Sequence, residues 1–154
     1  MVTVEVQPPS QVQAGAVMYP PLVVSSETDD SIDFIMIALV DSYGMVVDSL
    51  FGSVSASGKT LNDGSASRSS ASKQYSAFSD LVIGVAGVYS IQVTAYQMDY
   101  AASGGGAVAA SSTTTRHIMV YDESVAQEVA TTAEQNLLRR LRRNGRFGVP
   151  SAPR

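Results

Sequence analysis

Apolar and polar residues alternate along several short stretches of the chain, which is the spacing of strands with one buried face. Val2, Val4 and Val6 show this pattern near the start, and residues 89–96 show it over a longer run. Residues 32–40 become apolar on both faces toward their end, which is typical of a central strand. We also expect strands at 22–24, 45–47, 50–54, 75–83 and 116–121. The pattern predicts a mainly-β fold, a β-sandwich of about seven or eight strands.

Turn-forming residues separate these stretches. Pro8-Pro9 ends the first strand, because proline cannot donate a hydrogen bond to a neighbouring strand, and Pro20-Pro21 precedes the second. Residues 41–44, Asp-Ser-Tyr-Gly, predict a type I turn. The Ser-, Gly- and Ala-rich segments 55–73 and 101–115 are predicted to be flexible loops.

After Tyr121 the period of the apolar residues changes to that of a helix. Apolar residues recur every four positions at Val125, Val129, Ala133, Leu137 and Leu141. Asp122 can cap the start of such a helix, and Asn144-Gly145 can end it. The sequence therefore predicts a helix over 122–143, in a single domain that spans 1–149 with a tail at 150–154.

The composition of the chain excludes several classes of protein. The chain has 154 residues and no cysteine, which excludes a disulfide scaffold, a Cys-based zinc site and thiol catalysis. No apolar run is long enough to span a bilayer, and the first ten residues do not have the pattern of a secretory signal. We expect no membrane association and no small-molecule substrate.

The formal charge is divided very unevenly along the chain. All 14 acidic residues lie within 1–138, together with only Lys59, Arg68, Lys73 and Arg116, which gives this part a net charge of −10. Residues 139–154 contain six arginines and no acid, a net charge of +6. An acidic body with a basic end suggests contact with nucleic acid or another anionic surface, or nuclear import.

No group of residues forms a convincing catalytic or metal site. Ser57-Gly58-Lys59-Thr60 is similar to the end of a phosphate-binding loop, but residue 53 is serine where that loop needs glycine. His117 is the only histidine, and the acidic residues between 27 and 33 lack the spacing of a calcium-binding loop. We therefore predict a protein that is not an enzyme and has no catalytic residues, metal or cofactor.

The arginine cluster is the strongest polar signal in the sequence. It consists of Arg139, Arg140, Arg142, Arg143 and Arg146. Three interpretations stay open: a solvated helix end whose charges suit the helix dipole, a phosphate-contacting surface, and a nuclear-import signal. Phosphate contacts would give affinity for nucleic acid without sequence readout.

Four segments, in order along the chain, resemble the fungal velvet family. The first pairs Gln7-Pro8 with Gly15 and Pro20-Pro21, and the second is Gly52-Ser53-Val54-Ser55 with Leu61 and Asp63. The other two are similar to the family's F-P-D-L-x5-G-x-[YF] and V-Y…L-x-R-x-L-x-x-[QN]-G patterns. Their residues include Phe78, Asp80, Leu81, Gly87 and Tyr89, and then Tyr121, Leu137, Leu141 and Gly145.

This resemblance implies an immunoglobulin-like sandwich related to the DNA-binding domain of the Rel proteins. It also implies a transcriptional regulator of fungal development, sporulation and secondary metabolism, found in the nucleus and cytoplasm, that forms homo- or heterodimers with velvet proteins. The sequence departs from the family at two places. Ser79 replaces the proline of the F-P-D-L pattern. Residues 10–19, which correspond to the family's basic DNA-contacting segment, contain no basic residue, and Ala14 replaces a cysteine. The sequence therefore favours a dimer partner with weak or partner-dependent DNA binding. A structural or adhesive β-sandwich without a regulatory role is the alternative.

Overall fold

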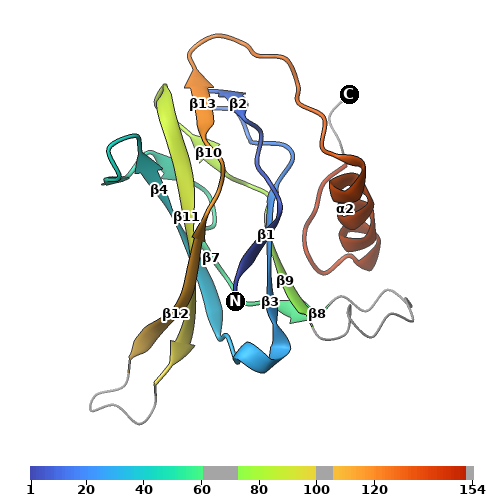
Figure 1. Ribbon diagram of the computed structural model, residues 1–154. Helices are drawn as coiled ribbons and strands as arrows, with labels where there is room; N and C mark the ends of the chain where they lie inside the picture. The colour runs from blue at the N-terminus through green and yellow to red at the C-terminus, as the bar shows by residue number, and fades with distance from the viewer. Residues whose placement is uncertain (61–72, 100–105, 152–154) are drawn as a thin grey trace.

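The computed structural model describes residues 1–60, 73–99 and 106–151, and its strands form two facing sheets (Figure 1). The first sheet has the order β1-β3-β9-β8. Its strands are β1 (Thr3–Val6), β3 (Leu22–Glu27), β9 (Lys73–Phe78) and β8 (Lys59–Thr60). A 3-10 turn, η1 (Thr28–Asp30), follows β3.

The second sheet has the order β2-β13-β11-β4-β5, with β12 paired to β11 and β7 to β4. Its main strands are β2 (Gln11–Gln13), β4 (Phe34–Asp41), β11 (Gly87–Met98) and β13 (Ile118–Tyr121). The shorter or flanking ones are β5 (Val46–Val47), β7 (Ser55–Ala56) and β12 (Ala107–Thr114). Strands β6 (Leu50–Phe51) and β10 (Val82–Ile83) form a separate pair.

The predicted β-sandwich is confirmed, because one main core fills the space between the two sheets. Alternate residues of β4 and β11 point into it, among them Ile35, Leu39, Ile91 and Val93, each at most 1% exposed. The predicted turn at 41–44 is also confirmed, since the Gly44 N–H donates to the Asp41 carbonyl oxygen at 3.0 Å.

Strand β1 supplies side chains to both faces of the first sheet. Val4 lies opposite Val24, but Val6 lies opposite Val23, so a bulge shifts the register between them. A shift of one residue turns the following side chains to the other face. Val2 and Val4 consequently pack into the main core, whereas Val6 packs on the outer side of the sheet.

The loop prediction for 101–115 is wrong over 107–114, which form β12. This strand pairs with β11 from Met98↔Ala107 to Gln92↔Thr114, and such pairing overrides the weak preference of small residues for strands. The loop prediction for 55–73 is likewise wrong where the structure has β7, β8 and the start of β9. The predicted 75–83 strand is divided into β9 and β10. Residues 61–72 and 100–105 lie outside the described residues.

The predicted helix over 122–143 is also wrong in its first half. The structure has helix α2 at Thr132–Asn144, and residues 122–131 run as an extended segment without helix. The helix begins where it does because Thr131 and Glu134 form a capping box, each side chain bonding the other residue's backbone N–H. It ends at Gly145, which has a φ of 79° and closes the last turn on the Leu141 carbonyl.

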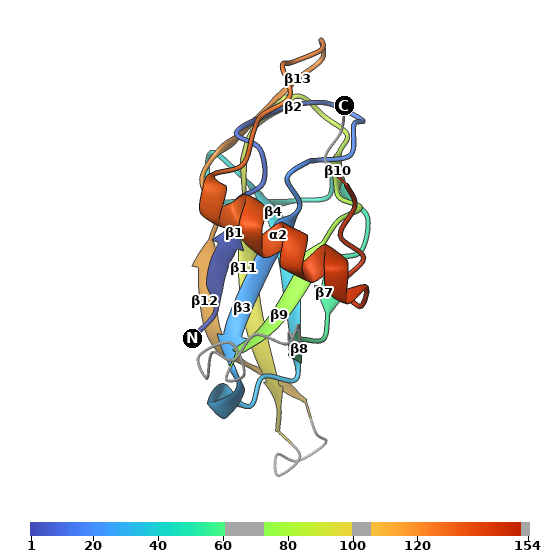
Figure 2. The same cartoon turned by 90° about the vertical axis from the view of Figure 1, so that its right-hand side faces the viewer.

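Helix α2 lies across the outer face of the β1-β3-β9-β8 sheet (Figure 2). Leu138 and Leu141 pack there against Val6, Val23 and Tyr75, and Phe147 and Val149 complete this second core. Strand β3 is therefore covered on both faces, which explains why five of its six residues are buried. In the described part of the chain, no helix is long and apolar enough to cross a membrane.

Candidate functional site

The arginine cluster occupies the side of α2 that faces away from the sheet. With about 100° between successive residues of a helix, Arg139, Arg142 and Arg143 fall within an arc of about 100°. The buried Leu141 lies on the opposite side, and the buried Leu138 lies between Leu141 and Arg142 around the helix. Arg146 follows the Gly145 cap and is exposed as well.

These arginines differ in their exposure and in their side-chain contacts. Arg139, Arg142, Arg143 and Arg146 are exposed, and none forms an ion pair with a carboxylate in the described ranges of the chain. Arg140 is only half-exposed and takes part in interactions of its own. The four exposed guanidinium groups therefore form a positive ridge that can contact an anionic partner without first breaking an internal ion pair.

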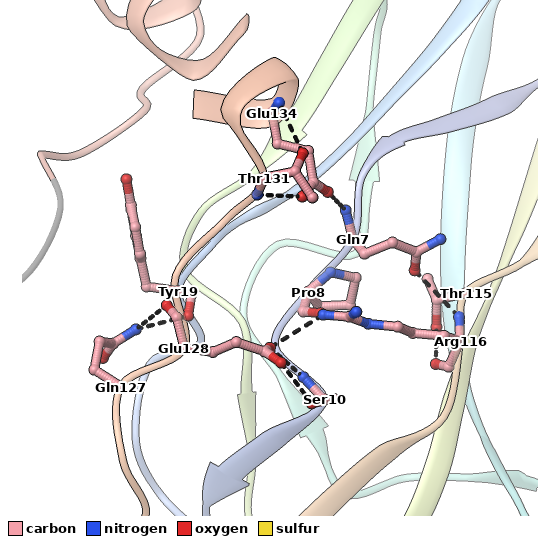
Figure 3. A network of polar contacts seen from close by, with 10 residues as sticks. All are labelled: Gln7, Pro8, Ser10, Tyr19, Thr115, Arg116, Gln127, Glu128, Thr131 and Glu134. Atoms are coloured by element: carbon pink, nitrogen blue, oxygen red, sulfur yellow. Dashed lines mark hydrogen bonds and ion pairs between the residues drawn. The ribbon is translucent and has the colours of Figure 1, made fainter. Parts of the chain in front are cut away.

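The segment 122–131, here called the strap, joins β13 to α2 and is fixed by Glu128 (Figure 3). The two Glu128 carboxylate oxygens accept hydrogen bonds from the Ser10 N–H and the Ser10 hydroxyl, each at 2.6 Å. Arg116 Nη2 lies 3.0 Å from the same carboxylate and also donates to the Pro8 carbonyl at 3.1 Å. Charged partners make these hydrogen bonds stronger than neutral ones.

The start of α2 is tied to the same N-terminal stretch. Glu134 accepts a hydrogen bond from the Gln7 N–H at 2.8 Å while its other oxygen accepts from the Thr131 N–H at 3.0 Å. Gln127 Nε2 donates to the Tyr19 carbonyl at 2.9 Å. Side chains of the strap and of α2 thus hold the ridge beside residues 7–19.

A groove of about 210 Å³ lies where these parts meet. Tyr19, Val129 and Leu138 supply apolar surface, and Arg139 and Arg142 line it from the helix. Residues 10–19 correspond to the DNA-contacting segment of the family that the sequence resembles, but they lack its positive charge. Through Tyr19 they lie next to the positive ridge. No pattern in the sequence indicates this neighbourhood, because it depends on the path of the strap.

Two of the velvet-like segments meet in space. The Asp80 carboxylate accepts hydrogen bonds from the Ser53 N–H at 3.0 Å and from the Ser53 hydroxyl at 3.0 Å. Gly52 has a φ of 117°, and a Cβ there would lie 2.5 Å from the Asp80 carbonyl oxygen. Gly52 thus leaves room for the Asp80 backbone, and the Asp80 carboxylate accepts hydrogen bonds from the adjoining Ser53.

Tyr89 and Gly87 form a second local contact of the motif residues. The Tyr89 hydroxyl donates to the Val85 carbonyl at 2.9 Å, so the ring folds back over the turn before β11. A Cβ at Gly87 would lie 3.1 Å from that hydroxyl, which leaves little space for a larger residue.

The remaining residues of the velvet-like segments lie in the two cores, at the end of α2 or at the end of β13. Phe78 and Leu81 are buried in the main core. Within α2, Leu141 is buried and Leu137 half-buried in the second core, and Gly145 caps the helix. Tyr121 is half-exposed at the end of β13.

Residues considered for other chemistry lie apart. His117 is exposed, and Lys59, in β8, donates to the Arg146 carbonyl at 2.8 Å. Within the residues that the structure describes, no cluster of His, Asp and Glu could hold a metal ion.

The residues predicted from the sequence do not include Glu128, Arg116, Tyr19 or the Thr131–Glu134 cap. Only the cap had a local signal, because T-x-x-E is the pattern of a capping box. Comparison of the chain with protein-family models and with curated proteins finds no match.

Proposed function

We propose that this chain is a velvet-like transcriptional regulator of fungal development, sporulation and secondary metabolism. It acts chiefly as a homo- or heterodimer partner, in the nucleus and cytoplasm, with weak or partner-dependent DNA binding. The proposal rests on the sequence resemblance together with the way the resembling segments meet.

The observation that carries the proposal is the contact between Gly52-Ser53 and Asp80. These residues belong to two separate velvet-like segments, and each is accounted for by the other's geometry. A chance resemblance would place such residues without regard to one another, so their contact favours a shared family fold.

The strand order supports an immunoglobulin-like sandwich. The order β1-β3-β9-β8 corresponds to strands A, B, E and D of that fold, and β13-β11-β4 corresponds to G, F and C. Tyr89, near the start of the F-like strand, bonds back to Val85 as the tyrosine corner of such domains does. Ile91, two residues later, is fully buried where antibody domains have a cysteine.

Binding to velvet proteins tests the proposal directly. A tagged full-length chain is expected to retain velvet-family proteins from a fungal extract at low salt, while an unrelated acidic β-sandwich is not. Failure to retain any of them would reject the partner role.

A second candidate function, direct contact with DNA, is favoured by the exposed ridge on α2. Because phosphate contacts release counterions, binding through the ridge should weaken steeply as salt rises. The triple variant Arg139→Glu, Arg142→Glu, Arg143→Glu should abolish a gel shift at low salt. The matched triple substitution to lysine should retain it. No shift of the unaltered chain at low salt would contradict direct binding.

The same variants address the structural or adhesive alternative. In fungal cells, a tagged chain is expected to accumulate in the nucleus, and the glutamate triple variant is expected to lose that accumulation. Exclusion of the unaltered chain from the nucleus would favour the alternative.

A further inference from the structure

We propose that the groove between the strap and α2 binds a short acidic segment of another protein, one that carries a large apolar side chain among its carboxylates. The inference goes beyond the proposed function, because it does not rest on the velvet resemblance. It rests on the apolar floor of the groove, on its cationic rim and on the bonds that hold its two walls together.

The floor of the groove is apolar. Leu138 is only 4% exposed there, and Tyr19 is half-buried and packs against the same second core. The strap supplies Val129, whose side chain lines the groove and is nevertheless 78% exposed. A large apolar side chain of a partner can therefore bury Val129 and contact Tyr19. Anchors that fill a pocket in this way contribute much of the binding energy of protein interfaces.

The rim on the helix side is cationic. With about 100° between successive residues of a helix, Leu138, Arg142 and Arg139 follow one another around α2. The leucine is buried, and the two arginines beside it are exposed and line the same groove. Arg139 donates only a long hydrogen bond of 3.4 Å to Asn136 Oδ1. Two guanidinium groups one helical turn apart can both bind carboxylates of one partner.

The acid of the groove does not compete with such a partner. Glu128 is the only acidic residue among those that line the groove. Its two carboxylate oxygens accept hydrogen bonds from Ser10, and the Arg116 guanidinium lies 3.0 Å from one of them. The charge that remains for a partner is that of Arg139 and Arg142, which is complementary to an acidic segment.

The two walls of the groove are held in place by hydrogen bonds. Gln135 Nε2, on α2, donates to the Ala130 carbonyl of the strap at 2.8 Å. Gln127 Nε2, on the strap, donates to the Tyr19 carbonyl at 2.9 Å (Figure 3). The strap therefore cannot leave α2 or Tyr19 without losing these bonds. A binding surface that is ordered in advance loses less entropy when its partner arrives.

The size of the groove favours an anchoring side chain over a free small molecule. Its volume of about 210 Å³ is below the roughly 300–1,000 Å³ of sites that enclose small ligands. A groove of this size suits one large side chain, while the rest of the partner segment lies on the surface and reaches the arginines of the rim.

Charge selects a short acidic segment over nucleic acid. Residues 1–138 carry a net charge of −10, whereas the exposed arginines are confined to α2 and Arg146. At physiological salt, exposed charges interact over only about 8 Å, so a few carboxylates at the groove are attracted by the ridge and screened from the acidic body. A DNA duplex extends its phosphates far beyond that distance, and they would meet the acidic body as well.

The test measures the binding of short labelled peptides to the full chain by fluorescence anisotropy. Each peptide of the panel places one phenylalanine, tryptophan, leucine or methionine among glutamates, at varied spacing. At least one peptide is expected to bind with a dissociation constant below about 1 mM, the weak end of specific binding. Replacing its apolar residue by serine, or its glutamates by lysine, should weaken binding at least about tenfold.

Variants of the chain separate the groove from the ridge as a whole. Arg142→Glu reverses a charge on the rim and should weaken peptide binding at least about tenfold. Val129→Ser removes an apolar contact and should weaken it at least about threefold. Arg143→Glu is the matched charge reversal, because Arg143 is exposed on the same helix but does not line the groove. It should weaken binding less than about threefold. Circular dichroism and thermal unfolding establish that each variant is folded.

Several outcomes overturn the inference. The first is that no peptide of the panel binds at about 1 mM. The second is an equal loss for Arg142→Glu and Arg143→Glu, or a serine-substituted peptide that binds as well as its parent. A DNA duplex of equal charge that displaces the peptide at about 0.15 M salt would make nucleic acid the occupant. Self-association that Arg142→Glu abolishes would make it a second copy. Retention of velvet proteins is measured separately, so either proposal can fail without the other.

Discussion

The outer faces of the two sheets have opposite surroundings in this molecule. The β1-β3-β9-β8 sheet is covered by α2 of the same chain, with Leu141 fully buried against it. The β2-β13-β11-β4-β5 sheet has no such cover from any described part of the chain, and Met36 is 40% exposed on it. An apolar sheet face can thus be buried by the chain itself or left available to a partner, and the difference should appear in stability measurements.

The largest effect is expected at the covered face. Leu141→Ala removes a fully buried side chain and leaves a cavity between α2 and β3. Urea unfolding should show a loss of about 2–5 kcal/mol in the free energy of unfolding. A loss below about 1 kcal/mol would mean that α2 does not seal this sheet as described.

A smaller loss is expected from the strap that brings α2 to the covered face. Glu128→Ala removes the acceptor for both Ser10 donors and the partner of Arg116. Hydrogen bonds to a charged group predict a loss of about 1–3 kcal/mol in urea unfolding. Glu123→Ala, at an exposed position of the same strap, is the control and should have almost no effect.

The helix cap should contribute less again. Thr131→Ala removes the oxygen that accepts from the Glu134 N–H and should cost about 1 kcal/mol of stability. Thr132 is the first residue of the helix, and its side chain does not make this capping bond. Thr132→Ala is therefore the control, and thermal unfolding compares the two variants. Equal effects of the two substitutions would contradict the capping box.

The uncovered face should give the smallest effect. Met36→Thr changes an exposed apolar side chain on a strand, so the monomer measured at low concentration should keep its stability within about 0.5 kcal/mol. A loss comparable to that of Leu141→Ala would show that both faces are sealed within one chain, and the contrast between them would disappear.

Much of the fold could be predicted because alternation marks strands buried on one face. Strands β1 and β11 follow from their alternating residues, and β4 follows from its apolar run. The turn at 41–44 follows from Asp41 and Gly44. Strand β12 could not be recognised, because its Ala, Ser and Thr residues bury little and depend on pairing with β11.

The start of α2 was missed for a different reason. Val125 and Val129 continue the four-residue spacing of Leu137 and Leu141, so periodicity alone extends the helix too far. The backbone of the strap is instead held by bonds to residues distant in sequence, such as Ser10. The arginines were predictable as a cluster, but their placement beside Tyr19 depends on that long-range path.

The parallel pairing of β2 with β13 has a consequence for how the chain is made. Gln11 lies opposite Met119, so the partner of a strand near the amino terminus emerges from the ribosome about a hundred residues later. Contacts this distant in sequence form slowly. Synthesis from the amino terminus therefore leaves β2 without its neighbour until β13 has been translated, and Gln7 waits longer still for Glu134. The sandwich is therefore completed only when the residues translated late have joined it. In a nascent chain that stops before residue 121, the second sheet lacks the complete pairing of β2 with β13.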